Sequence, residues 1–121
     1  DMPPVIIIKN NQALLHLHSG DFSFIDGNAI SRLYDLLAEK SITANLIQTG
    51  AVTLMICTDD KEDKINQLAV AASAIFDVKV EKNLCLLTIR HYTPEAVAEM
   101  TDGKQIVLKQ QSPQTVQFLL R

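Results

Sequence analysis

The feature that most constrains this fold is the order along the chain of segments with a strand-like apolar pattern and segments with a helix-like one. Eight short segments are continuously apolar or alternate apolar and polar residues, which is typical of strands. They span residues 5–8, 13–18, 42–48, 52–58, 78–81, 84–90, 105–108 and 115–120. Three other segments repeat apolar residues at the helical period. The sequence therefore predicts an α+β fold.

Two of the three predicted helices begin at a recognisable cap. The first follows Asp26 as N-cap and runs to about Lys40. The third begins at Pro94, with Thr93 as its cap. The second has an apolar stripe made of Ile65, Leu68, Ala69, Ala72 and Ile75. Acidic residues precede this stripe, namely Asp59, Asp60, Glu62 and Asp63. We interpret them as complementing the helix dipole, with metal or substrate binding as the alternative.

From residue 13 the elements run strand, helix, strand, strand, helix, strand, which is the ferredoxin-like βαββαβ order. This predicts a first domain over residues 13–82. A second unit of strand, helix, strand, strand starts at residue 84, and the strand at 5–8 would complete its edge. The second domain is thus expected to be discontinuous, residues 1–12 plus 83–121, with its last helix missing at the C-terminus. One domain would be inserted into the other.

Composition excludes several classes of protein. The 121 residues are 47% hydrophobic and 21% charged, which is typical of a globular domain. A net charge of −3 argues against nucleic acid and membrane surfaces as partners. No apolar run approaches the roughly 20 residues of a membrane span. Two cysteines without CxxC spacing favour a reducing, cytoplasmic setting. A start without signal-peptide features suggests a piece of a longer protein.

Three single motifs could each indicate a chemical site. His16 and His18 lie on one face of a predicted strand and could bind a metal, but a third ligand is not apparent, so we expect no metal site. Because side chains alternate along a strand, we expect Leu15 and Leu17 to face the helices instead. Cys57 and Cys85 are expected to be inert thiols in apolar strands, with a nucleophilic site as the alternative. The "DGN" loop at 26–28 lacks the glycine pattern of nucleotide sites.

Longer stretches resemble a known family. These are "NNQALLHLHS" at 10–19, "AISRLYDLLAEKSITANLIQTGAVTLMI" at 29–56, "VKVEKNLCLLTIRH" at 78–91 and "KQIVLKQQSPQTVQFLL" at 104–120. They are similar to the C-terminal regulatory region of aspartate kinases, a tandem pair of ACT domains, most nearly of the monofunctional lysine-sensitive type. The resemblance covers nearly the whole chain.

The resemblance implies an allosteric sensor rather than an enzyme. In this family a separate kinase domain, which uses ATP and magnesium, phosphorylates aspartate. The ACT pair binds an end-product amino acid, usually lysine or threonine, and pairs with a second subunit. We therefore expect no catalytic residue or cofactor in this chain, a homodimer, and the parent's own kinase domain as a partner.

The family's effector site carries over residue by residue. It lies between the loop and start of the first ACT helix and the second strand of a neighbouring ACT unit. The implied effector-binding residues here are Ser23, Asp26, Gly27, Asn28, Ala29, Ile30, Thr43, Ala44, Asn45, Thr49, Gly50 and Ala51. A helix N-terminus favours the carboxylate of an amino acid, and acceptors such as the Asn45 carbonyl suit its ammonium group.

Three positions depart from the lysine-binding pattern. Relatives that bind lysine commonly carry aspartate where this chain has Asn45, and a Ser-Glu pair where it has Gly50 and Ala51. Losing a charge-assisted hydrogen bond costs about 1.5–3 kcal/mol, so a neutral effector such as threonine is an alternative to lysine. A dimerisation module without a working site and a regulatory domain of another amino-acid enzyme are further alternatives. An RNA-binding module is disfavoured, because the strands lack paired aromatic residues.

Overall fold

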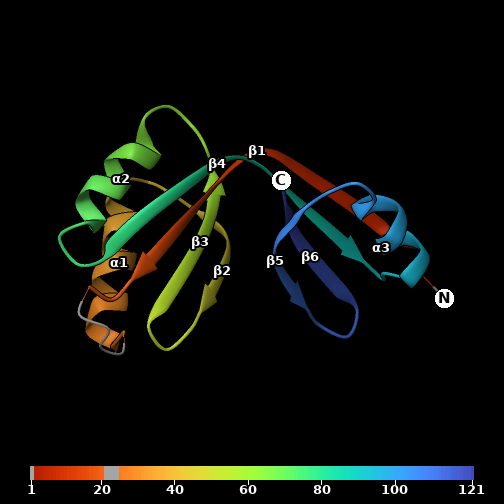
Figure 1. Ribbon diagram of the computed structural model, residues 1–121, viewed down its shortest axis with the longest axis horizontal. Helices are drawn as coiled ribbons and strands as arrows, with labels where there is room; N and C mark the ends of the chain where they lie inside the picture. Colours follow the sequence, from red (N-terminus) through yellow and green to blue (C-terminus); the bar gives the residue numbers. More distant parts are fainter. Residues whose placement is uncertain (1, 21–24) are drawn as a thin grey trace. The chain divides into compact units, whose positions relative to one another are not determined.

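The computed structural model describes residues 2–20 and 25–121 and contains three helices and six strands in that part of the chain (Figure 1). Their order is β1 (Val5–His18), α1 (Gly27–Glu39), β2 (Ala44–Thr49), β3 (Thr53–Asp59), α2 (Lys64–Ala72), β4 (Asp77–Arg90), α3 (Pro94–Thr101), β5 (Ile106–Gln111) and β6 (Thr115–Leu120). The predicted α+β class is confirmed.

The structure corrects the predicted number of strands. The segments expected at 5–8 and 13–18 are one continuous strand, β1, and those at 78–81 and 84–90 are one strand, β4. Each long strand contains an asparagine with a positive φ, 55° at Asn11 and 61° at Asn83. Asparagine tolerates this left-handed conformation better than most residues do. The polar interruption that separated the predicted strands is a local backbone irregularity and not a strand end.

The chain forms two compact units, Ala13–Lys82 and Asp1–Gln12 together with Asn83–Arg121. In the Ala13–Lys82 unit the strand order is β2-β3-β1-β4. Its helices cover one face of this sheet, and the core between them is made of Ala13, Leu15, Leu17, Leu33, Leu37, Leu54, Ile56, Ile65, Leu68, Ala72 and Phe76. Leu15 and Leu17 therefore face the helices, as expected.

The other unit uses the first part of β1 and the second part of β4. The strand order is β1-β4-β6-β5, and β6 pairs antiparallel with both β4 and β5. Its core contains Leu87, Ile89, Val116, Phe118 and Leu120, against which Val97 and Met100 of α3 pack. Four consecutive aliphatic residues of the edge strand β1, Val5 to Ile8, are each 43–49% exposed.

The helices α1 and α3 begin at the predicted residues, whereas α2 ends at Ala72, before Ile75 of the predicted apolar stripe. The Asp26 side chain accepts a hydrogen bond from Ala29 N, and the Thr93 side chain accepts one from Ala96 N. Asp63 occupies the N-cap position of α2 without a side-chain capping bond. No helix in the described part of the chain is long and apolar enough to span a membrane.

Candidate effector site

The start of α1 is held by the side chain of Asp26. The Asp26 Oδ1 atom lies 2.8 Å from Ala29 N, and Ile30 N donates to the Asp26 carbonyl at 3.2 Å. The first N–H groups of a helix have no partner within the helix, so those of Gly27 and Asn28 are the donors that this end can offer. The Asp26 carboxylate already lies there, which makes the end less attractive to an anion than a neutral cap would.

The turn between β2 and β3 lies beside this helix start. Ile25 N donates to the Ala51 carbonyl at 2.9 Å, and Gly50 N donates to the Thr53 carbonyl at 2.8 Å. A Cβ atom added at Gly50 would lie only 2.9 Å from Thr53 Oγ1. A serine at this position would therefore require Thr53 to move. Ser23 lies outside the described residues.

Thr49 ends β2 directly before Gly50, whereas the other predicted residues of this segment, Thr43, Ala44 and Asn45, lie at the other end of α1. Ile42 N donates to the Leu37 carbonyl, which ties the beginning of β2 to the C-terminal turn of the helix. A helix of 13 residues is about 20 Å long. Within one chain the structure thus brings Asp26–Ile30 close to Gly50 and Ala51, but it leaves Thr43–Asn45 at a distance from them.

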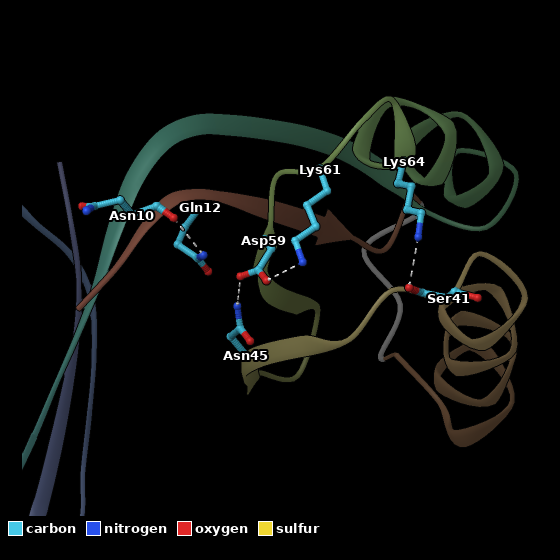
Figure 2. A network of polar contacts seen from close by, with 7 residues as sticks. All are labelled: Asn10, Gln12, Ser41, Asn45, Asp59, Lys61 and Lys64. Carbon is cyan, nitrogen blue, oxygen red and sulfur yellow. Dashed lines mark hydrogen bonds and ion pairs between the residues drawn. The ribbon is translucent and has the colours of Figure 1, made fainter. Parts of the chain in front are cut away.

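A β-bulge at the start of β2 sets the direction of Asn45. Ala44 pairs with Thr58 and Leu46 with Cys57, so Asn45 is an extra residue with no opposite partner. Its side chain donates a hydrogen bond from Nδ2 to Asp59 Oδ1 at 2.8 Å, at the end of β3 (Figure 2). Bulges often redirect side chains next to functional sites. Although the Asn45 side chain is neutral, it is therefore hydrogen-bonded to a carboxylate, that of Asp59.

Asp59 also borders a cavity of about 140 Å³ at this end of the unit. The residues that line the cavity are Ser41, Ile42, Thr43, Asp59, Lys61 and Lys64. Lys61 Nζ lies 3.7 Å from Asp59 Oδ2, and Lys64 Nζ lies 3.5 Å from the Ser41 carbonyl (Figure 2). From the sequence, Asp59 was interpreted as complementing the dipole of α2, with metal or substrate binding as the alternative, and neither lysine was predicted to lie at a site.

The histidines that suggested a metal are half-buried. Burial lowers the pKa of His16; the Glu81 carboxylate acts in the opposite direction, and the charges of His18 and Lys79 add to the lowering. Among the described residues, no three histidine, cysteine, aspartate or glutamate side chains are grouped so that they could hold a metal ion. Cys57 is buried within β3.

Comparisons with known proteins identify the fold. No protein-family model matches the chain, and no characterised protein sequence matches it. A structure described as the C-terminal regulatory domain of an aspartate kinase from Porphyromonas gingivalis W83 is 17% identical, has a TM-score of 0.82, and covers 100% of this chain and 88% of its own. The ligand-free regulatory subunit of aspartate kinase from Thermus thermophilus is 16% identical, with a TM-score of 0.68, over 95% of this chain and 84% of its own.

Escherichia coli aspartokinase III, in a complex with lysine and aspartate, is 22% identical and has a TM-score of 0.72 over 94% of this chain. The chain spans only 28% of the length of that enzyme. The tandem ACT architecture that the sequence resemblance implied is thus confirmed as a fold. The chain has the α+β, ferredoxin-like fold of the regulatory regions of aspartate kinases.

Proposed function

We propose that this chain is the amino-acid-sensing regulatory region of an aspartate kinase. The observation that carries the proposal is the combination of the shared fold with a helix start, Asp26–Ile30, that lies against the Gly50–Ala51 turn. In this proposal the parent protein is cytoplasmic, and its kinase domain binds ATP and magnesium. The effector controls that domain through feedback on aspartate-family amino-acid biosynthesis.

The local chemistry favours a neutral effector over lysine. A lysine side chain needs an acidic partner, and neither Asn45, Gly50 nor Ala51 provides one. Asp59 lies next to Asn45, but its carboxylate already accepts the Asn45 amide and lies 3.7 Å from the Lys61 ammonium. We therefore expect an amino acid of the threonine type to bind more tightly than lysine.

Isothermal titration calorimetry with threonine, lysine and methionine tests the effector proposal. Threonine should bind at millimolar concentration or below, and it should raise the melting temperature as the ligand concentration increases. Ala51→Glu restores an acidic group at the turn and should shift the preference toward lysine, whereas Ala98→Glu, on exposed α3, serves as the control. Heat from none of the three amino acids would favour a dimerisation module without a working site.

We propose that two copies of the chain also associate. Edge strands expose unpaired backbone groups, and the β1 edge in the discontinuous unit carries four exposed aliphatic residues without a charge among them. Antiparallel pairing with a second copy would place Ile6 against Ile7 and would bring no like charges together. This pairing would protect the edge from non-specific aggregation.

Sedimentation velocity at micromolar concentration tests the dimer. Ile7→Lys should shift the chain to the monomer, because it places a charge in the centre of the paired edge. Ile106→Lys is the matched control, since Ile106 is 48% exposed on the opposite edge of the same sheet and Ile7 is 45% exposed. A monomeric wild-type chain, or an equal effect of both substitutions, would contradict association through β1.

A further inference from the structure

We propose that the Tyr92 side chain is a built-in occupant of the discontinuous unit, where it fills the junction between the start of α3 and the β5–β6 turn and holds the two together. The corresponding junction of the continuous unit, Ala13–Lys82, is the candidate effector site. Tyr92 has this role whatever that other junction binds, so only the comparison with an effector rests on the proposed function.

The two units repeat one arrangement of elements. In the continuous unit β1, α1 and the β2–β3 hairpin follow one another along the chain, and in the discontinuous unit β4, α3 and the β5–β6 hairpin do (Figure 1). The continuous unit has the strand order β2-β3-β1-β4, and the discontinuous unit, read from its own hairpin, has the order β5-β6-β4-β1. The start of α3 and the β5–β6 turn therefore correspond to the start of α1 and the β2–β3 turn.

The backbone hydrogen bonds around the two turns also match. In both, the first turn residue donates its N–H to the carbonyl of the residue that begins the next strand. The residue that follows β1 or β4 likewise donates its N–H to the carbonyl of the third turn residue. The backbone is thus built alike at the two junctions. The donor and acceptor pairs are Gly50 with Thr53 and Ser19 with Val52 in the continuous unit, and Ser112 with Thr115 and His91 with Gln114 in the discontinuous one.

The junctions differ in the segment that leads from the strand to the helix. In the continuous unit, residues 20–25 lead to the cap residue of α1. In the discontinuous unit, Tyr92 alone lies between His91 and the cap residue of α3, Thr93. His91 is held by its hydrogen bond to the turn, and the Thr93 hydroxyl lies 3.1 Å from Ala96 N. Tyr92 is therefore anchored through both of its neighbours.

The Tyr92 side chain connects the core of its unit to the turn. It packs against the buried cluster that includes Leu87 and Phe118. Its hydroxyl donates a hydrogen bond to the Ser112 carbonyl at 3.2 Å and accepts one from Gln111 Nε2 at 2.7 Å. Tyrosine suits such a position, because its ring is apolar and its hydroxyl binds polar groups. One side chain thus bridges the start of α3 and the β5–β6 turn.

A tethered occupant differs from a free ligand in its effective concentration. A free ligand binds and dissociates, so its occupancy follows its concentration in solution. A group attached to the same chain is always close to its site, and its effective concentration is high and constant. The discontinuous unit should consequently keep its turn and its helix together at every effector concentration. The chain should therefore bind one effector molecule and not two.

Chemical complementation of Tyr92→Ala tests this role. The substitution removes a phenol group and should lower the melting temperature by roughly 10 °C. Phenol at millimolar concentration should raise the melting temperature again and shift the amide signals of Ser112 and Ala96 in nuclear magnetic resonance spectra. Benzene lacks the hydroxyl and should act several-fold more weakly. Tyr34→Ala is the matched control, because Tyr34 is 48% exposed on α1 and phenol should not stabilise that variant.

Tyr92→Phe tests the hydroxyl separately and keeps the ring in the core, so it provides a result even if Tyr92→Ala does not fold. Without the hydrogen bonds of the hydroxyl, the turn should open more often. We expect the Ser112 amide to exchange its hydrogen several-fold faster than in the wild-type chain. The corresponding amide of the continuous unit, that of Gly50, should exchange at an unchanged rate.

Three results would overturn the proposal. The first is that phenol stabilises the wild-type chain as much as Tyr92→Ala. The second is that Tyr92→Phe leaves the exchange of the Ser112 amide unchanged. The third is that threonine shifts the signals of the β5–β6 turn in the wild-type chain. If threonine shifts no signal at Asp26–Ile30, the proposed function fails, and the phenol and exchange results still decide the role of Tyr92.

Discussion

Asp26 fixes the start of α1 by accepting the Ala29 N–H at 2.8 Å. Removing such a cap costs about 1 kcal/mol, whereas asparagine in its place keeps most of the stability. We expect Asp26→Ala to lower the free energy of unfolding of the Ala13–Lys82 unit by about 1 kcal/mol. Urea denaturation followed by circular dichroism measures this change. Asp26→Asn is the matched variant, and an equal loss in both would show that the charge and not the cap is responsible.

Thr58 carries the one buried side-chain oxygen or nitrogen without a hydrogen-bond partner among the described residues, its Oγ1 atom. A buried polar atom left unsatisfied costs about 1–3 kcal/mol. Thr58→Val keeps the shape and removes that atom, so it should raise the free energy of unfolding by about 1 kcal/mol.

Thr88 provides the comparison, because its hydroxyl accepts a hydrogen bond from Gln117 Nε2 at 3.0 Å. Thr88→Val should therefore be destabilising. If both valine substitutions change stability in the same direction, the Thr58 hydroxyl has a partner in solution.

His16 should make the stability of the chain depend on pH. Burial lowers its pKa in the folded state, below the value of about 6.5 expected in the unfolded chain. The unfolded state then binds more protons between the two pKa values, so stability rises with pH there. The contribution is fully present above about pH 6.5 and is lost as the pH falls through the folded pKa.

Unfolding by urea between mildly acidic and neutral pH should show this slope, and His16→Gln should reduce it. His91→Asn is the control, because Asn tolerates the positive φ of 54° at that position. A slope that is unchanged in His16→Gln would mean that another group causes the pH dependence.

At the scale of elements, β1 and β4 each contribute to both units and each contain an asparagine with a positive φ. A non-glycine residue in the left-handed region costs about 1–2 kcal/mol, less for asparagine. Asn83→Val should therefore destabilise the chain by about 1–2 kcal/mol, and Asn83→Gly should be nearly neutral. Thermal unfolding of the two variants provides the measurement. Equal stability of both would show that β4 relaxes to a regular strand at this position.

The sequence predicted local features well because they depend on neighbouring residues. The caps Asp26 and Thr93 and the apolar faces of the helices were recognised from spacing alone. The continuity of β1 was missed because the "NNQ" interruption resembles a turn, and only the three-dimensional structure shows that the strand passes through it.

The candidate sites depend on contacts between residues far apart in the sequence. Asn45 and Asp59 are 14 positions apart and meet because one bulged residue turns Asn45 toward the end of β3. No periodicity in the sequence indicates a bulge at that position. For the same reason, the lysines that border the cavity were not considered together with Asp59.

At the scale of the whole molecule, one cluster of buried apolar residues lies within Ala13–Lys82 and another within the discontinuous unit, and these two clusters share no residue. The members of the first cluster lie between Ala13 and Val78, and those of the second lie between Cys85 and Leu120. The first unit is continuous in sequence and the second is not. The cluster of the continuous unit thus comes from one uninterrupted segment of the chain.

A fragment of residues 13–82 should consequently fold on its own. Seventy residues can bury a core of this size, although such domains are only marginally stable. We expect the fragment to give dispersed amide signals by nuclear magnetic resonance and a cooperative unfolding transition. Phe76→Ala in the same fragment is the control and should abolish the transition, because Phe76 is 4% exposed within the core. A disordered wild-type fragment would show that the strands shared through β1 and β4 make the two units depend on each other for stability.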